Sequence, residues 1–135
     1  MLRYNPQINN ARLHVIRDAI DADGLGTVKI YTAPRPAQAG GAVGSATLLT
    51  TGTFQNPCAG SASQGQLTFN SISGGDAVAS GQAAWGRIEA GDGSFVADAT
   101  VGTDQATAEI VINTTAILDG APVQFGTSTI ISGNN

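Results

Sequence analysis

A helix-like pattern of residues occurs only at the start of this chain, and short strand-like stretches follow it to the end. Residues 9–22 carry apolar side chains at helical spacing. After residue 24, about seven or eight stretches of alternating residues are separated by turn signals. No second helix follows, so parallel βαβ units are excluded. The pattern predicts a mainly β fold, an antiparallel β-sandwich or jelly roll with one N-terminal α-helix.

The expected helix has recognisable start and stop signals. We expect Asn9 to be its N-cap, because an asparagine side chain accepts hydrogen bonds from the free amides of the first turn. Residues of one apolar stripe follow: Leu13, Ile16 and Ile20. Asp23 and Gly24 end the helix, because glycine readily takes the left-handed conformation there. Met1–Asn9 then form an N-terminal arm ahead of the helix.

The β part reads as a series of strands joined by turns. The expected strands are 27–32, 48–54, 66–72, 79–89, 94–99, 109–115 and 123–131. Asp92 and Gly93 predict a hairpin between two of them, and the Gly/Ala-rich stretch 37–46 predicts a mobile connection. A chain of 135 residues is typical of a single domain. We therefore expect one domain over 1–135, with an arm and helix in 1–24 and a β-sandwich body in 27–131.

Charge is divided unevenly along the chain. Residues 1–35 hold five basic and three acidic residues, a balance of +2; residues 36–135 hold one basic and seven acidic residues, a balance of −6. The net charge of −4 argues against nucleic acid as a partner, because phosphate binding needs clustered Lys and Arg. Charged residues make up only 12% of the chain. A surface with so few charges is easily buried against another protein.

Residue types that carry chemistry are scarce. One cysteine, Cys58, excludes an intrachain disulfide, and we expect it to be a buried or loop thiol. His14, the one histidine, has no second ligand type nearby in the sequence. We expect no enzyme activity, no cofactor and no metal site. No apolar run approaches the roughly 20 residues of a membrane span, and no secretory leader is expected, so we predict no membrane partner.

Trp85 and Arg87 lie two residues apart in one expected strand and therefore share a face. A tryptophan in a strand is most often a core residue, and the alternative is an interface anchor. Arg87 is the only basic residue after Arg35. We expect it to pair with Glu89, with Asp98 or with a neighbouring subunit.

Several segments resemble a family of phage proteins. They are Asn9-Asn10-Ala11-Arg12-Leu13, Ile16–Ala22, Thr27–Tyr31, Pro34-Arg35-Pro36-Ala37, Trp85-Gly86-Arg87-Ile88 and Asp92-Gly93-Ser94-Phe95. As an ordered set these are similar to small proteins encoded beside the major capsid protein in tailed bacteriophages and prophages of proteobacteria. Some members are similar to capsid cement or decoration proteins, which are β-sandwich or jelly-roll subunits on the outside of the head shell.

The resemblance implies a virion structural protein on the capsid surface, made in the host cytoplasm. Its partners would be the major capsid protein and further copies of itself, as a homodimer or homotrimer. We place the contacts at five residues and two loops: Arg3, Tyr4, Arg35, Trp85, Arg87, 37–46 and 55–64. Two other classes stay open. One is a tail, neck or fibre-associated β protein; the other, less favoured for lack of exposed aromatic residues, is a β module that binds carbohydrate or a host surface.

Overall fold

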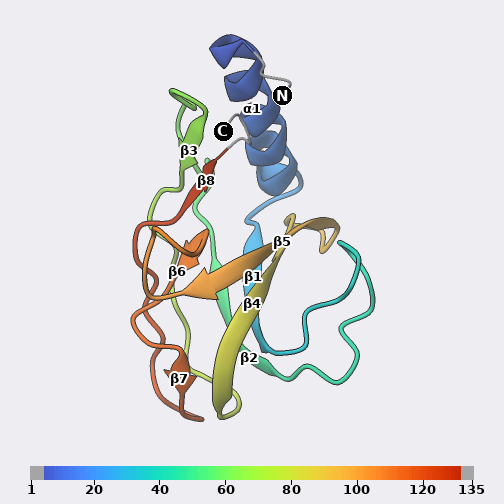
Figure 1. Ribbon diagram of the computed structural model, residues 1–135, viewed down its shortest axis with the longest axis vertical. Coiled ribbons are helices and arrows are strands. Elements are labelled where there is room, and N and C mark those ends of the chain that lie inside the picture. Colours follow the sequence, from blue (N-terminus) through green and yellow to red (C-terminus); the bar gives the residue numbers. More distant parts are fainter. Residues whose placement is uncertain (1–4, 132–135) are drawn as a thin grey trace.

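The computed structural model describes residues 5–131 and contains one helix above a mainly β body (Figure 1). The helix, α1, spans Pro6–Asp21. The strands are β1 (Thr27–Thr32), β2 (Leu48–Thr53), β3 (Gln66–Thr68), β4 (Gly81–Glu89), β5 (Phe95–Gly102), β6 (Ile110–Val111), β7 (Ala116–Ile117) and β8 (Thr129–Ile131). Within the described part of the chain, no helix has the length and apolar character needed to cross a membrane.

The strands form one curled mixed sheet and one small pair. The larger sheet has the order β2-β1-β4-β5-β6, and β7 pairs with the start of β4. The smaller pair consists of β3 and β8. β5 and β6 run parallel, so the expectation of a wholly antiparallel arrangement is wrong at this pair. The reason is the loop 103–109, which carries the chain back along β5 and is held by hydrogen bonds from Thr107 N–H and Ala108 N–H to the carbonyl of Asp104.

The centre of the larger sheet follows the sequence pattern closely. β1 has the expected bounds, with Val28 and Ile30 fully buried on one face and Lys29 on the other. β4 and β5 form the expected hairpin, in which Ala90 N–H donates to the carbonyl of Ser94. Alternation in a central strand predicts both the strand and its buried face.

The shorter strands depart from the sequence expectation. β3 ends at Thr68 instead of residue 72, and the expected strands 109–115 and 123–131 shorten to β6 and β8. β7 was not expected at all. In the parts of these expected strands that form no ladder, isolated β-bridges occur, such as those of Ile112 with Phe125 and of Ala59 with Phe69. Alternation predicts an extended backbone here, but the chain bends before a ladder of hydrogen bonds can develop.

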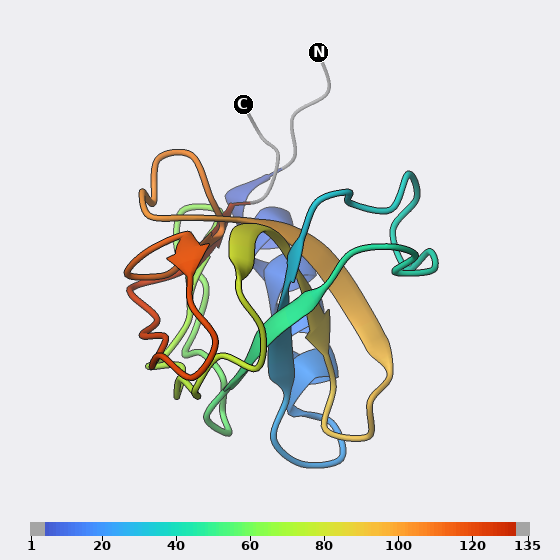
Figure 2. The same cartoon turned by 90° about the horizontal axis from the view of Figure 1, so that it is seen from below.

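The core lies between the larger sheet and the C-terminal segments, which are drawn in orange and red in Figure 2 and lie to one side of β1, β2 and β4. Phe125 packs directly over Gly52 of β2, where a Cβ atom would lie 2.6 Å from its ring. The same Cβ atom would lie 3.0 Å from Ile72 Cγ2. The glycine therefore allows an aromatic ring to close onto the sheet.

The helix begins earlier than expected. Asn5 is the N-cap, and its side chain accepts a hydrogen bond from Gln7 N–H at 2.8 Å. Pro6 occupies the first helical position, where an N–H group would lack an intrahelical partner anyway. Asn9 is buried inside the helix, so the expectation that it forms the cap is wrong. The expected arm over Met1–Asn9 is wrong for residues 6–9, which are helical, and residues 1–4 lie outside the described part.

Candidate interaction surface

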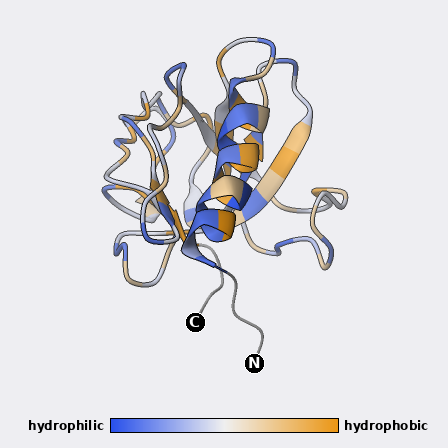
Figure 3. Cartoon of the chain, turned by 90° about the horizontal axis from the view of Figure 1, so that it is seen from above, coloured by the Kyte–Doolittle hydropathy of each residue, from blue (hydrophilic) through white to orange (hydrophobic). Residues whose placement is uncertain are grey.

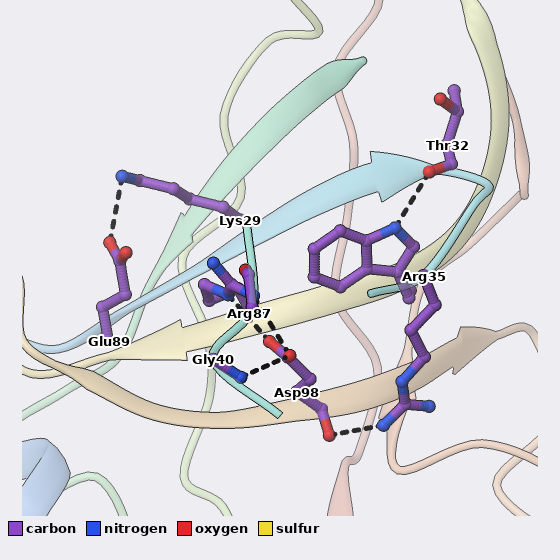
Figure 4. Close-up of polar contacts among 9 residues, drawn as sticks. Lys29, Thr32, Arg35, Gly40, Arg87, Glu89 and Asp98 are labelled. Atoms are coloured by element: carbon purple, nitrogen blue, oxygen red, sulfur yellow. Dashed lines mark hydrogen bonds and ion pairs between the residues drawn. The ribbon is translucent and has the colours of Figure 1, made fainter. Parts of the chain in front are cut away.

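The predicted contact residues that the structure describes come together on the outer face of the larger sheet. Strand pairing aligns Lys29, Arg87 and Asp98 in one row across β1, β4 and β5. The next row on the same face contains Trp85. The loop 33–47 between β1 and β2 passes over these rows, and Figure 4 shows how it meets them through Gly40 and Arg35.

Arg87 and Asp98 form an ion pair on this face. Arg87 donates from Nε to Asp98 Oδ1 at 2.8 Å and from Nη2 to Oδ2 at 3.1 Å. Their side chains are 11% and 2% exposed. The bidentate geometry fixes both groups in orientation, which a single contact would not. Of the three partners expected for Arg87, the structure shows Asp98; Glu89 pairs instead with Lys29 at 2.9 Å.

The ion pair also holds the loop 33–47. Gly40 N–H donates to Asp98 Oδ2 at 3.2 Å, and Arg87 Nη2 donates to the carbonyl of Gly41 at 2.7 Å. Arg35 donates to the carbonyl of Asp98 at 2.8 Å and to Thr100 Oγ1 at 3.3 Å. Arg35, Gly40 and Gly41 are therefore tied to β4 and β5. The mobility expected from the Gly/Ala composition of 37–46 stays a prediction.

These contacts set the charge state of the pair. Burial by itself raises the pKa of Asp98, but hydrogen bonds from Arg87 and Gly40 N–H, with the charges of Arg87 and Arg35, outweigh it and lower that pKa below its usual range. The hydrogen bond with Asp98 raises the pKa of Arg87 further above its usual value. Both groups are charged at neutral pH.

Trp85 is buried, and its ring packs beside the guanidinium group of the Arg87–Asp98 pair. Its side chain is 1% exposed, stacks on Tyr31 with ring centroids 4.7 Å apart, and donates from Nε1 to the carbonyl of Thr32 at 2.9 Å. The Arg87 guanidinium carbon lies 5.4 Å from the Trp85 ring and 5.2 Å from that of Phe95. This placement matches the core reading of Trp85.

The structure thus brings Arg35, Trp85 and Arg87 together and leaves only Arg35 exposed. Arg3 and Tyr4, the other two predicted contact residues, lie outside the described residues. Contact with a partner stays a prediction for all five. Sequence reasoning named Asp98 as one possible partner of Arg87, but it missed the hydrogen bond that Asp98 accepts from Gly40 N–H of the loop 33–47.

The second predicted contact loop, 55–64, is occupied by contacts with α1. His14 Nε2 accepts a hydrogen bond from Ala62 N–H at 2.8 Å, and Asp21 Oδ1 accepts one from Cys58 N–H at 2.9 Å. Arg17 Nη1 donates to the carbonyl of Gly60 at 3.1 Å. Polar side chains of the helix therefore bind the backbone of this loop. The contact of His14 with the loop could not be predicted from spacing in the sequence.

Cys58 is a structural thiol. It is fully buried, as expected, and lies 3.7 Å from the carbonyl of Arg17. Burial raises its pKa to about 12, and the nearby Asp21 carboxylate adds to the effect. At neutral pH the group is protonated and is therefore a poor nucleophile.

The acidic side chains of the outer face are already engaged with other groups of the protein. Within residues 5–131, no group of three or more His, Cys, Asp or Glu side chains is placed to hold a metal ion. Asp98 already accepts from Arg87 and Gly40, and Glu89 is paired with Lys29. No protein-family model, curated protein or solved structure matches the chain.

Proposed function

We propose that this protein is a capsid decoration, or cement, subunit of a tailed bacteriophage. It binds the outside of the head shell and stabilises it through non-covalent contacts with the major capsid protein and with further copies of itself. The family resemblance of the sequence suggests this role. The observation that carries it is the loop 33–47, which has no charge beyond Arg35 and is held by hydrogen bonds against the outer face of the larger sheet.

The loop 33–47 suits burial against another protein. No charged residue occurs between Arg35 and Asp76, so this part of the surface has no ions to desolvate on contact. Gly40 and Gly41 are tied to Asp98 and Arg87, while Ala42, Gly44 and Ser45 are exposed beyond them. A loop that is already ordered loses less conformational entropy on binding than a mobile one.

The mainly β body is compatible with the architecture of such subunits. We assign the packing of the C-terminal segments over the larger sheet to the β-sandwich or jelly-roll type. Many copies on one lattice would each contribute a small stabilising energy. Modest contacts per copy then add up to a large effect on the shell.

Shell binding tests the proposal directly. Purified protein is mixed with phage shells that lack it, and the bound fraction is measured by co-sedimentation. We expect saturable binding, and weaker binding by Ser45→Glu, which puts a charge on the exposed part of the loop. Ser71→Glu, at an exposed serine outside the loop, should bind like the unmodified protein.

Two results would count against this role. No binding to shells by correctly folded protein would remove the cement proposal. Binding to purified tails or necks instead of shells would favour the tail, neck or fibre class. Carbohydrate is less favoured as the ligand, because Trp85 and Tyr31 are buried and Phe95, 42% exposed, already packs 5.2 Å from the Arg87 guanidinium carbon.

A further inference from the structure

One side of α1 carries four polar side chains at helical spacing. The polar row, defined here by these side chains, consists of Asn10, His14, Arg17 and Asp21. Steps of four, three and four residues bring them onto one line along the helix. In Figure 3, α1 lies in front of the rest of the chain, and hydrophilic segments recur along it. All four side chains contact the backbone of residues 58–65.

The residues 58–65 run antiparallel to the helix along the polar row. Near the start of α1, Gly65 N–H donates to Asn10 Oδ1 at 2.9 Å. Near the end of α1, Cys58 N–H donates to Asp21 Oδ1 at 2.9 Å. The other two members of the row make their contacts between these ends. Each contact therefore depends on whether one side chain of α1 can still accept or donate a hydrogen bond.

His14 is the member of the polar row whose side-chain type changes charge near neutral pH. Its Nε2 accepts from Ala62 N–H at 2.8 Å, so this nitrogen carries no proton in the contact. A protonated imidazole has two N–H donors and no acceptor, so it would present a donor to a donor. Ala62 is 8% exposed, so water does not readily replace the lost acceptor. Protonation of His14 therefore removes the contact.

Among the described residues, little charge faces His14 from the elements packed against α1. Residues 55–65 contain no charged side chain, and the thiol of Cys58 is neutral because burial raises its pKa to about 12. The helix also packs against β3, which has no charged residue, and against β5, whose one charged residue is Asp98. Asp98 is paired with Arg87. These elements therefore supply no counter-charge that would hold His14 protonated.

The charges on α1 itself do not favour one form of His14 strongly. Arg17 and Asp18 lie one turn further along the helix, and they pair with each other at 3.1 Å. Asp21 lies two turns away, about 10 Å along the axis, where salt screens its effect. Arg12 lies on another side of the helix. The hydrogen bond with the loop backbone therefore decides which form the folded protein prefers.

We propose that His14 is a pH switch that releases the middle of residues 58–65 from α1 in mild acid. The contact is complete where histidine is neutral, above about pH 8, and is lost as pH falls toward about 5. The attached state binds fewer protons than the open one, so acid favours opening. Asn10 does not titrate, and carboxylates change charge at much lower pH than imidazoles, so both ends stay attached and the opening is local.

The consequence concerns the surface of the molecule. The released stretch belongs to the loop 55–64, one of the two loops predicted to contact a partner. Acid would therefore change the shape that this loop presents. The switch needs no shell, so it is independent of the proposed function.

Amide hydrogen exchange of the full chain, measured by NMR at about pH 7.5 and about pH 5.5, tests the switch. Protection is expressed relative to an unstructured peptide at the same pH. We expect the protection of the Ala62 amide to fall about ten-fold or more at the lower pH. The amides of Gly65 and Cys58 are internal controls and should keep their protection, because their acceptors do not change charge in this range. The ring signals of His14 should titrate together with the Ala62 amide.

His14→Gln separates titration from structure. Glutamine can place an amide oxygen near the position of Nε2, and this acceptor does not titrate. We expect the variant to protect the Ala62 amide equally at both pH values, whereas His14→Leu should leave it weakly protected at both. Circular dichroism of each variant checks that α1 is intact. Protection of Ala62 that does not change with pH, a fall that persists in His14→Gln, or an equal fall at Gly65 and Cys58 would each overturn the proposal.

Discussion

At the scale of single residues, the Arg87–Asp98 pair is the feature on which the outer face depends. The Asp98 side chain is 2% exposed and serves two elements at once, since it binds Arg87 of β4 and Gly40 of the loop 33–47. Arg87 in turn reaches the carbonyl of Gly41. The main effect of the pair is therefore to fix the position of the loop 33–47, and its contribution to net stability is secondary.

Removing one charge of this pair should be costly. We expect Asp98→Asn to lower the free energy of unfolding by about 3 kcal/mol, because Arg87 then stays buried without its counter-charge. Glu89→Gln is the control, since the Lys29 side chain of that pair is 36% exposed and exposed pairs contribute about 1 kcal/mol or less. Urea unfolding of both variants at neutral pH measures the difference. Equal losses in the two variants would contradict the special position of Asp98.

Acid should remove the difference between the unmodified protein and Asp98→Asn. The pKa of Asp98 is lowered in the folded protein, so its contribution to stability is complete above the unfolded pKa near 4 and declines as pH falls toward the folded value. The two unfolding free energies should therefore converge in unfolding experiments below about pH 4. A gap that stays constant down to pH 2 would show that the effect of the substitution is not electrostatic.

At the scale of elements, the sequence predicts central strands well and local contacts poorly. β1 and the β4–β5 hairpin follow from alternation and from the Asp92-Gly93 turn. The helix start was misjudged because two asparagines, Asn5 and Asn9, both resemble caps, and Pro6 decides between them. Side-chain contacts with distant backbone, such as His14 with Ala62 and Asp98 with Gly40, leave no pattern in sequence spacing.

Hydrogen exchange should reveal how firmly the loop 33–47 is held. We expect Arg35→Ala to speed exchange of the Gly40 amide about ten-fold, because the variant loses a charged hydrogen bond between the loop and β5. Lys29→Ala, on the same face but paired with Glu89, should leave that amide unchanged. Mass spectrometry of the peptide over 34–41 gives the readout. Fast exchange of Gly40 in the unmodified protein would mean that the loop is mobile after all.

At the scale of the whole molecule, the mainly β class with one N-terminal helix was predictable, because strand alternation and a single helical stretch are local signals. The parallel pairing of β5 with β6 was not, since it depends on how the loop 103–109 returns. The sequence predicted that Trp85 and Arg87 share a face, because they lie two residues apart in one strand. It did not predict that Arg35 lies on the same face. A folded chain was needed to bring Arg35 to Asp98, 63 residues away.

The most direct test of the proposed role is the copy number of this protein in purified virions, measured against the major capsid protein by quantitative mass spectrometry. A cement subunit that covers the lattice should be present at about one copy per major capsid protein. A few to a few dozen copies would place the protein in the neck, tail or fibre. Absence from virions would contradict the virion role altogether.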